Sequence, residues 1–407
     1  MKVPEYSTSA TSVLSEPVAP SVVTPVKKMQ SGKTSPAPIE VTNLVCFSHL
    51  RWNFVYQRPQ HLLSRASEQY TVYFLEEPIW GPEEWLETRA INERLTVVVP
   101  HLKHGTSHED SLAYQRRVVD ELLASNQISD YIAWYYTPMA LQFSDHLRPT
   151  LTVYDCMDEL SAFLGAPPQL LEKEKELMQR ADVVFTGGYS LYEAKQKRHP
   201  HVFAFPSSID YNHFASARRP TADPADQQPL PNPRIGFSGV IDERFDIELM
   251  RELAQRRRDW QFVMLGPIVK VDPNHLPQGD NIHYLGMKDY KQLPTYFSNW
   301  DVAILPFALN ASTRYISPTK TPEYLAAGLP VVSTPIRDVV RTYGSEGFVQ
   351  IADTARTFET AIETALKGHH PTDWATIDTF LAENSWDNTW GEMNRLMQAQ
   401  FKLTQEQ

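Results

Sequence analysis

Residues 317–332 read SPTKTPEYLAAGLPVV. They follow a β-prone run at 302–305 and a loop, and they predict a short helix that ends at Gly328, followed by a buried strand. Ser317 or Thr321 could cap this helix, because either hydroxyl can accept a hydrogen bond from a free backbone N–H. A strand, a helix and a second strand in this order are typical of a parallel sheet covered by helices.

The same alternation continues on both sides of this stretch. Helices are expected between several of the strands, for example over 59–67 and 168–180. We expect strands at 44–47, 71–75, 95–99, 131–135, 151–154, 182–186, 202–205, 234–237, 261–265, 282–285, 302–305, 330–333 and 348–351. The predicted fold is α/β, with two Rossmann-like, doubly wound domains that face a cleft and with helices at the C-terminal end.

Shifts in composition give the expected domain limits. The first 40 residues are rich in Ser, Thr and Pro with one aromatic residue, Tyr6, and predict a disordered tail that serves as a linker or tether. A segment rich in Pro, Asp and Gln separates the two halves. The predicted parts are a tail at 1–40, a first domain at 41–214, a linker at 215–233, a second domain at 234–384 and a C-terminal helix at 385–407.

Length and charge exclude several classes of protein. The chain has 407 residues, too many for one ordinary domain, and Lys+Arg 38 against Asp+Glu 49 gives a net charge of −11. That charge argues against a general nucleic-acid binder. Cys46 and Cys156 are too few for a disulfide framework or a zinc site. No apolar run reaches the ~18–20 residues of a membrane span. We expect a cytoplasmic protein without a metal, with peripheral contact at the inner face of the membrane left open.

The quoted stretch combines groups that suit a phosphorylated ligand. Unpaired N–H groups at a helix N-terminus attract a phosphate, and Lys320 adds a mobile positive charge there. Glu323 follows about one turn later, where its carboxylate could accept hydrogen bonds from both hydroxyls of a ribose. The alternative is an ordinary capped helix with a Lys320–Glu323 pair on its surface.

Two further sets of polar residues follow predicted strands of the first half. Asp155 and Asp158 come at the end of the run at 151–154, where they face the cleft or cap the next helix or turn. The second set follows the first strand, and either contacts a sugar or its phosphate or packs within its own domain. It comprises His49, Arg51, Trp52 and Arg58.

The 317–332 stretch resembles the nucleotide-sugar segment of GT-B glycosyltransferases of the large family 4-like group, P-x-K-x-x-E-Y-L-A-x-G-x-P-V-V. These proteins include the glycosyltransferase family 1 domains of bacterial surface-polysaccharide loci. Three more segments resemble the group in the same order: SSIDYNHF at 207–214, IGFSG at 235–239 followed by Arg244, and Ser385-Trp386. The resemblance covers roughly residues 42–400 and implies an acceptor-binding first domain and a nucleotide-sugar-binding second domain.

The resemblance implies a role for each matching residue. Gly239 would let the backbone approach the donor diphosphate, and Arg244 and Lys320 would neutralise the departing diphosphate in place of a metal. Glu323 would bind the ribose, and the backbone around Ser317 and Thr319 would hold phosphate. The donor would be a nucleotide diphosphate-sugar, with UDP or GDP expected first, and no cofactor is implied.

The sequence departs from the family pattern in two places. Tyr315 stands eight residues before Glu323, where the group usually has a first glutamate, and loop 242–246 holds three acids around Arg244. Retaining members often have a histidine near Asp155; the aspartates here resemble a glucuronosyltransferase type in which an aspartate is the base of an inverting reaction. A base must lie within about 3 Å of the attacking hydroxyl. Asp155 and Asp158 favour inversion and the C-terminal segment favours retention, so the outcome stays open.

The resulting hypothesis is a metal-independent hexosyltransferase. It would move a sugar from a nucleotide diphosphate-sugar to a hydroxyl of a cell-surface glycan or lipid-linked precursor. One alternative is a sugar-nucleotide 2-epimerase of the same fold, which needs several acids and histidines around the sugar. The other is a non-catalytic subunit that binds a glycan or a partner, which the missing first glutamate motivates.

Overall fold

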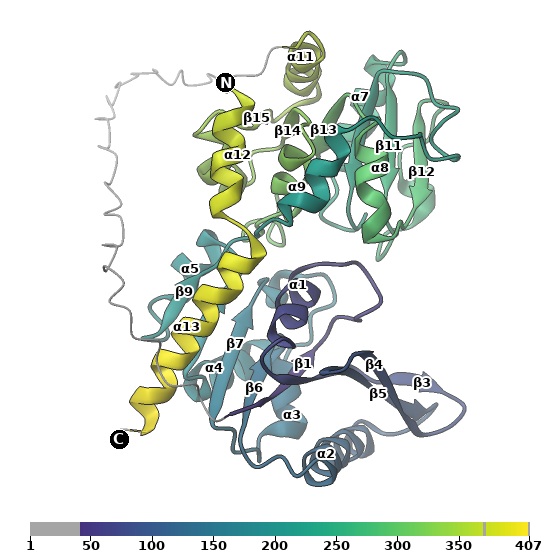
Figure 1. Ribbon diagram of the computed structural model, residues 1–407. Helices are drawn as coiled ribbons and strands as arrows, with labels where there is room; N and C mark the ends of the chain where they lie inside the picture. Colours follow the sequence, from purple (N-terminus) through teal and green to yellow (C-terminus); the bar gives the residue numbers. More distant parts are fainter. Residues whose placement is uncertain (1–40, 369–371, 406–407) are drawn as a thin grey trace, which may run out of the picture. The chain divides into compact units, whose positions relative to one another are not determined.

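The computed structural model describes residues 41–368 and 372–405 (Figure 1). The predicted tail at 1–40 lies outside these ranges. The described residues form two mainly parallel sheets with helices between most successive strands, as predicted. Within these residues, the helices are too short or too polar to cross a membrane.

The first sheet has the strand order β3-β5-β2-β1-β6-β7-β8-β9, with β4 paired to β5. All neighbours run parallel except β4, which is antiparallel to β5. The strands are β1 (Asn43–Ser48), β2 (Thr71–Glu76), β3 (Ile79–Gly81), β4 (Trp85–Asn92), β5 (Leu95–Lys103), β6 (Tyr131–Tyr135), β7 (Leu151–Cys156), β8 (Val183–Thr186) and β9 (Val202–Ala204). The sequence prediction missed β3 and β4, because these edge strands are largely exposed and lack a buried apolar run.

The second sheet has the order β12-β11-β10-β13-β14-β15 and is parallel throughout. Its strands lie within two residues of the predicted runs. They are β10 (Arg234–Ser238), β11 (Gln261–Leu265), β12 (Ile282–Gly286), β13 (Val302–Leu305), β14 (Val331–Ser333) and β15 (Gln350–Ile351).

Helices cover both sheets. Those of the first half are α1 (Arg58–Ala66), α2 (His108–Ser125), α3 (Leu141–Ser144), α4 (Leu170–Arg180), α5 (Tyr189–Lys195) and α6 (Tyr211–Ala215). Those that follow are α7 (Ile247–Arg256), α8 (Leu293–Phe297), α9 (Lys320–Ala326), α10 (Arg337–Val339), α11 (Ala355–Leu366), α12 (Trp374–Glu383) and α13 (Trp386–Gln405). Short 3-10 turns lie over Pro138–Ala140, Leu160–Ala162, Ser216–Arg218, Pro273–His275 and Tyr290–Gln292, and a π turn over Val340–Gly344.

The last two helices belong to different cores. Ile377 and Leu381 of α12 pack in the core of the second sheet. Trp386 and Met393 of α13 pack instead on the first sheet, with Trp134 of β6 (Figure 1). The chain therefore returns to the first sheet after completing the second, and the domain limits drawn from composition stay predictions.

Candidate active site

Helix α9 begins one turn into the stretch that predicted it. Thr319 is its N-cap and its side chain makes no capping hydrogen bond, so the predicted caps, Ser317 and Thr321, are both wrong. The Thr321 hydroxyl is buried inside the first turn without a partner, and the Ser317 carbonyl accepts a hydrogen bond from Ser207 Oγ at 2.6 Å. Gly328 ends the helix at φ +81, a backbone conformation that favours glycine.

Lys320 and Glu323 form an ion pair, with Nζ and Oε2 2.6 Å apart. The alternative interpretation placed this pair on the helix surface, but the two side chains are only 10% and 4% exposed. Burial raises the pKa of Glu323, and the Lys320 charge opposes that shift. The pair therefore stands inside the protein, where a new anion near Lys320 would compete directly with Glu323.

Tyr324 fixes α9 to the end of β10. Its hydroxyl accepts a hydrogen bond from the backbone N–H of Ser238 at 2.6 Å and lies 3.2 Å from the Ser238 carbonyl oxygen, to which it donates. Gly239 follows directly, and Gly266 at φ +137 lies so near that an added Cβ would stand 1.8 Å from the Gly239 carbonyl oxygen. Lys320 and the Gly239 loop are thus held in fixed relation by side-chain packing.

Two adjoining cavities lie over the carboxyl ends of the strands, and they share Val55, Tyr56, Ser238, Gly239 and Lys320. The larger, of about 650 Å³, extends over the ends of β10 and β11 and the loop at 287–293, and is lined from the first half by residues 52–56. The smaller, of about 130 Å³, contains most of the predicted site. Its lining includes Arg58, Asp158, Gly239, Arg244, Ser317, Thr319 and Lys320.

Arg244 lines the smaller cavity and forms an ion pair with Asp242. Its Nε and Nη2 contact the carboxylate of Asp242 at 3.0 and 2.6 Å, and its guanidinium lies over the ring of Phe163 from the first half, 5.3 Å from the centroid. Both predicted donor cations, Arg244 and Lys320, therefore have an acid two or three residues away as their present partner.

The two predicted catalytic aspartates have different surroundings. Asp155 ends β7 with no exposed surface, and both its carboxylate oxygens lie 3.0 Å from Arg58 Nε. Arg58 also donates to the carbonyl of Phe205 at 2.8 Å. Asp158 lines the smaller cavity. Burial raises its pKa to about 6; Arg244 opposes the shift, Asp242 adds to it and Arg58 also opposes it. Asp155 is therefore part of a buried ion pair, whereas Asp158 faces the space where a substrate would stand.

The loop that carries Asp158 is fixed by residues that the sequence analysis did not select. Lys195 Nζ donates to Glu159 Oε2 at 2.7 Å and also contacts Glu174. At Gly187 an added Cβ would stand 2.4 Å from the Met157 carbonyl oxygen, so a side chain there would displace the loop. These contacts join residues up to 36 positions apart, so no local sequence motif predicts them.

The predicted acceptor-binding residues are mostly engaged within the first half. Arg51 donates to Glu76 Oε2 at 3.1 Å and to the Pro78 carbonyl at 3.0 Å. Trp52 is 8% exposed and packs edge-on against Phe74, although it also lines the larger cavity. Burial lowers the pKa of His49 to about 4, and its Nδ1 is buried without a partner. The acceptor roles of His49, Arg51, Trp52 and Arg58 stay predictions.

An aromatic stack joins the two halves beside the cavities. Tyr56 stacks on Tyr290 with centroids 4.4 Å apart, and His213 stacks on Tyr290 at the same centroid distance. Burial raises the pKa of Tyr290, and the nearby Glu323 charge adds to this. Its hydroxyl is buried without a hydrogen-bond partner. The sequence offered no signal for this stack, because its members come from a loop, a 3-10 turn and helix α6, which lie far apart in the chain.

In the part of the chain that the structure covers, no group of three or more His, Cys, Asp or Glu side chains could hold a metal ion. His104 and His108, which lie near Glu109 in sequence, thus gain no third ligand among the described residues.

This chain is similar to known proteins in sequence and in fold. Residues 232–368 match the model of the family Glycosyl transferases group 1. The putative teichuronic acid biosynthesis glycosyltransferase TuaH of Bacillus subtilis (strain 168) is 26% identical over 279 residues, which span 64% of this chain and 66% of that protein.

Solved structures share the fold at low identity. A trehalose-6-phosphate structure from E. coli, bound with UDP-2-fluoro glucose, has a TM-score of 0.65 at 14% identity, covering 88% of this chain and 99% of that one. Sucrose-phosphate synthase from Thermosynechococcus elongatus has a TM-score of 0.64 at 16% identity, covering 89% and 100%. The predicted GT-B fold and the family resemblance are confirmed: the chain has the fold of these solved structures, and its residues 232–368 match the glycosyl transferases group 1 model.

Proposed function

We propose that this protein is a glycosyltransferase that moves a sugar from a nucleotide diphosphate-sugar to a hydroxyl of a cell-envelope glycan or its lipid-linked precursor. One observation carries the proposal. A single cavity is lined by an acid from the first half, Asp158, and by Gly239, Arg244 and Lys320 from the second. Such a cavity combines a proton acceptor with fixed positive charge for a departing diphosphate.

The donor would bind across both cavities. Its diphosphate would lie against Lys320, Arg244 and the backbone at Ser317 and Thr319, and its base in the larger cavity at the ends of β10 and β11. An anion beside Lys320 would weaken the hold of Lys320 on Glu323, whose carboxylate then becomes available to ribose hydroxyls. UDP and GDP are the proposed nucleotides. Lys320 and Arg244 would take the place of a metal.

Asp158 is the proposed base. With a pKa of about 6, it is mostly ionised at neutral pH and can accept a proton from the acceptor hydroxyl. The hydroxyl oxygen would bond to the anomeric carbon, the bond from that carbon to the diphosphate would break, and the hydroxyl proton would pass to Asp158. This direct displacement inverts the anomeric centre. Asp155 would act only by holding Arg58 and the end of β7.

The same cavity favours transfer over 2-epimerisation. An epimerase needs several acids and histidines around the sugar, and Asp158 is the one such residue among those described in the lining of the smaller cavity. The name of the Bacillus relative supports a cell-envelope polysaccharide as the product. We therefore place the proposed reaction in the cytoplasm, at the inner face of the membrane.

Thermal unfolding with a panel of nucleotides tests the donor site. UDP or GDP at 100 times its dissociation constant should add about 2.7 kcal/mol of stability. Glu323→Gln should reduce this shift, because the neutral amide binds ribose hydroxyls less well than a carboxylate. Glu383→Gln, on the exposed end of α12, is the matched control. A panel without any shift, or a full shift in Glu323→Gln, would contradict the donor assignment.

A further inference from the structure

A third cavity, of about 260 Å³, lies within the first half of the chain. It shares no lining residue with the two cavities of the proposed active site. Its walls come from the ends of β1 and β2, from β5, from α2 and from residues 137–143. The proposed function gives this space no role.

The lining contains apolar side chains that belong to no core. Leu112 of α2 and Met139 are only half-buried, and neither is part of a hydrophobic core cluster. Both line the cavity, together with Leu75, Phe143 and Trp80. An apolar ligand that covered these side chains would be stabilised by the burial of their apolar surface.

The charge of the lining rejects an anionic ligand. The described residues around this space include Glu76 and Glu77 but neither lysine nor arginine. Glu76 is already engaged by the backbone N–H of Trp52 at 2.8 Å and by Arg51 at 3.1 Å. Burial raises the pKa of Glu77, with Arg51 opposing. A phosphate or carboxylate would find two acids here and no basic side chain except the imidazole of His108, so an uncharged chain fits better.

The cavity opens beside an apolar arm formed by β3 and β4. In register, Trp80 of β3 lies opposite Leu102 of β5. Trp80 is 46% exposed and Trp85 50% exposed. Five of the fourteen exposed large apolar side chains in the described chain belong to this arm: Ile79, Trp80, Trp85, Leu86 and Ile91. Successive side chains of a strand point to opposite faces, so these five side chains divide between the two faces of the arm, and Trp80 is the one of them that also lines the cavity.

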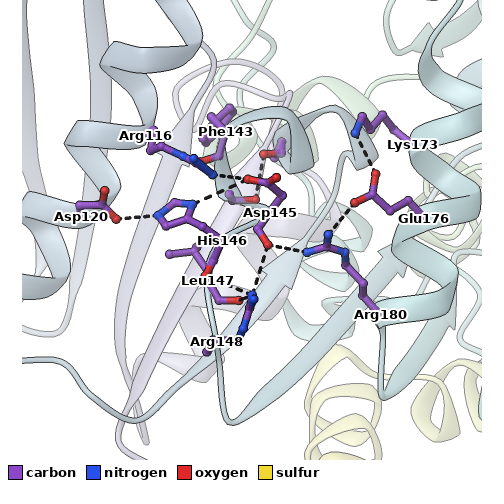
Figure 2. Close-up of polar contacts among 12 residues, drawn as sticks. Arg116, Asp120, Phe143, Asp145, His146, Leu147, Arg148, Lys173, Glu176 and Arg180 are labelled. Atoms are coloured by element: carbon purple, nitrogen blue, oxygen red, sulfur yellow. Dashed lines mark hydrogen bonds and ion pairs between the residues drawn. The ribbon is translucent and has the colours of Figure 1, made fainter.

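The wall formed by α2 and α3 is tied in place by polar contacts (Figure 2). Arg116 of α2 pairs with Asp145 and lies 3.5 Å from the carbonyl oxygen of Phe143, which lines the cavity. Asp120 of α2 pairs with His146 at 2.7 Å. Arg180 of α4 donates to the Asp145 carbonyl at 2.7 Å. These contacts on the outer side of the wall hold α2 and the end of α3 together beside the cavity.

The cavity adjoins the proposed active site at the same edge of the first sheet. Ser48 and Thr137, at the ends of β1 and β6, line it, and β7 beside them ends just before Asp158. The Glu76 carboxylate that borders this cavity holds Trp52, which lines the larger active-site cavity. A molecule anchored here would extend toward the proposed acceptor position.

We propose that this cavity and the β3–β4 arm bind the uncharged hydrocarbon chain of a lipid-linked acceptor. The inference rests on the proposed function and gives its acceptor a chemical class. Leu112 and Met139 would contact the chain within the cavity, and Trp80 would cover it at the rim. The sugar end of the acceptor would then project along the sheet edge toward Asp158.

Two neutral fluorescent probes test this proposal on the full chain: N-dodecyl dansylamide and N-ethyl dansylamide, which lacks the long chain. We expect one dodecyl probe per protein, bound at least ~10-fold more tightly than the ethyl probe, because affinity grows with each buried methylene. Leu112→Glu and Met139→Gln should each weaken dodecyl binding at least ~10-fold. Leu171→Glu, at an exposed site on α4, is the control and should bind normally.

Equal affinity for the two probes, or unchanged dodecyl binding in both cavity variants, would overturn the proposal. The proposal would also fall if Trp85→Ser weakened dodecyl binding while Leu112→Glu and Met139→Gln left it unchanged. In that case the arm would be a contact for the membrane surface. The nucleotide-induced thermal shift is measured on the same samples. A normal shift shows that each variant is folded, and it separates a failure of this inference from a failure of the proposed donor site.

Discussion

Charges on the proposed donor and acceptor sides of the two cavities are paired in different ways. On the donor side, Lys320 pairs with Glu323 and Arg244 with Asp242, partners two or three residues apart. On the acceptor side, Arg58 pairs with Asp155 across 97 residues, and both side chains are almost fully buried. A local pair at a cavity wall can release its cation to a ligand without unfolding anything. A buried pair between distant elements holds the fold together and cannot be released at low cost.

The largest effect on stability is expected from breaking the long-range pair. Arg58→Met leaves Asp155 buried without its cation and should lower the free energy of unfolding by about 3–5 kcal/mol. Urea denaturation measures the loss. The double variant Arg58→Met/Asp155→Leu should recover much of it, because no charge then remains buried. If Arg58→Met lowered the free energy of unfolding by less than about 1 kcal/mol, the buried long-range pair would be no more important for stability than a local pair, which would contradict the comparison.

A smaller effect of opposite sign is expected at Asp158. Folding raises its pKa from the ordinary 3.8 to about 6, so the folded state holds this proton more tightly than the unfolded state. The stability that this group provides is complete below pH 3.8 and is lost as the pH rises to about 6. Asp158→Asn should therefore be more stable than the natural protein at pH 7, by about 2–3 kcal/mol.

Denaturant titrations at pH 4 and pH 7 check that sign. The stability gain of Asp158→Asn should be present at pH 7 and nearly absent at pH 4. The same gain at both pH values would show that the substitution acts through packing. A variant less stable than the natural protein at pH 7 would contradict the raised pKa.

The smallest effect is expected at an exposed local pair. Arg395 and Glu392 lie on α13 with side chains 62% and 52% exposed, and their Nε and Oε2 are 2.8 Å apart. Arg395→Ala should change the free energy of unfolding by about 0.3 kcal/mol, because water screens such pairs. The same urea series measures it. A loss near that of Arg58→Met would show that separation along the chain and burial do not decide the cost.

The same contrast explains what the sequence could and could not predict. Buried apolar runs placed most strands within two residues, and the proposed donor residues from Gly239 to Lys320 could be selected because they lie in local stretches. Strand β4 was missed because its side chains are exposed and its pairing with β5 alone defines it. The helix cap was misplaced because the sequence analysis looked for a hydroxyl that accepts a capping hydrogen bond, whereas Thr319 begins α9 without one.

Long-range pairing limited the prediction of the acceptor side. Asp155 and Asp158 have the same residue type, three positions apart, and only the structure shows that Arg58 engages the first and leaves the second beside the cavity. The spacing of Lys320 and Glu323 indicated their pairing, but the burial of that pair depends on helix packing against the sheet. The stack of Tyr56 on Tyr290 joins residues from the two halves and left no pattern in either.

The most direct test of the account is the rate of sugar transfer by Asp158→Asn. A panel of radiolabelled UDP- and GDP-sugars is offered with lipid-linked glycans extracted from a bacterial envelope, and the nucleotide-induced thermal shift is recorded in parallel. We predict that the variant keeps the full nucleotide shift and transfers sugar at least ~100-fold more slowly than the natural protein. Transfer at an unchanged rate by Asp158→Asn would contradict the claim that one cavity combines the donor charges with the catalytic base.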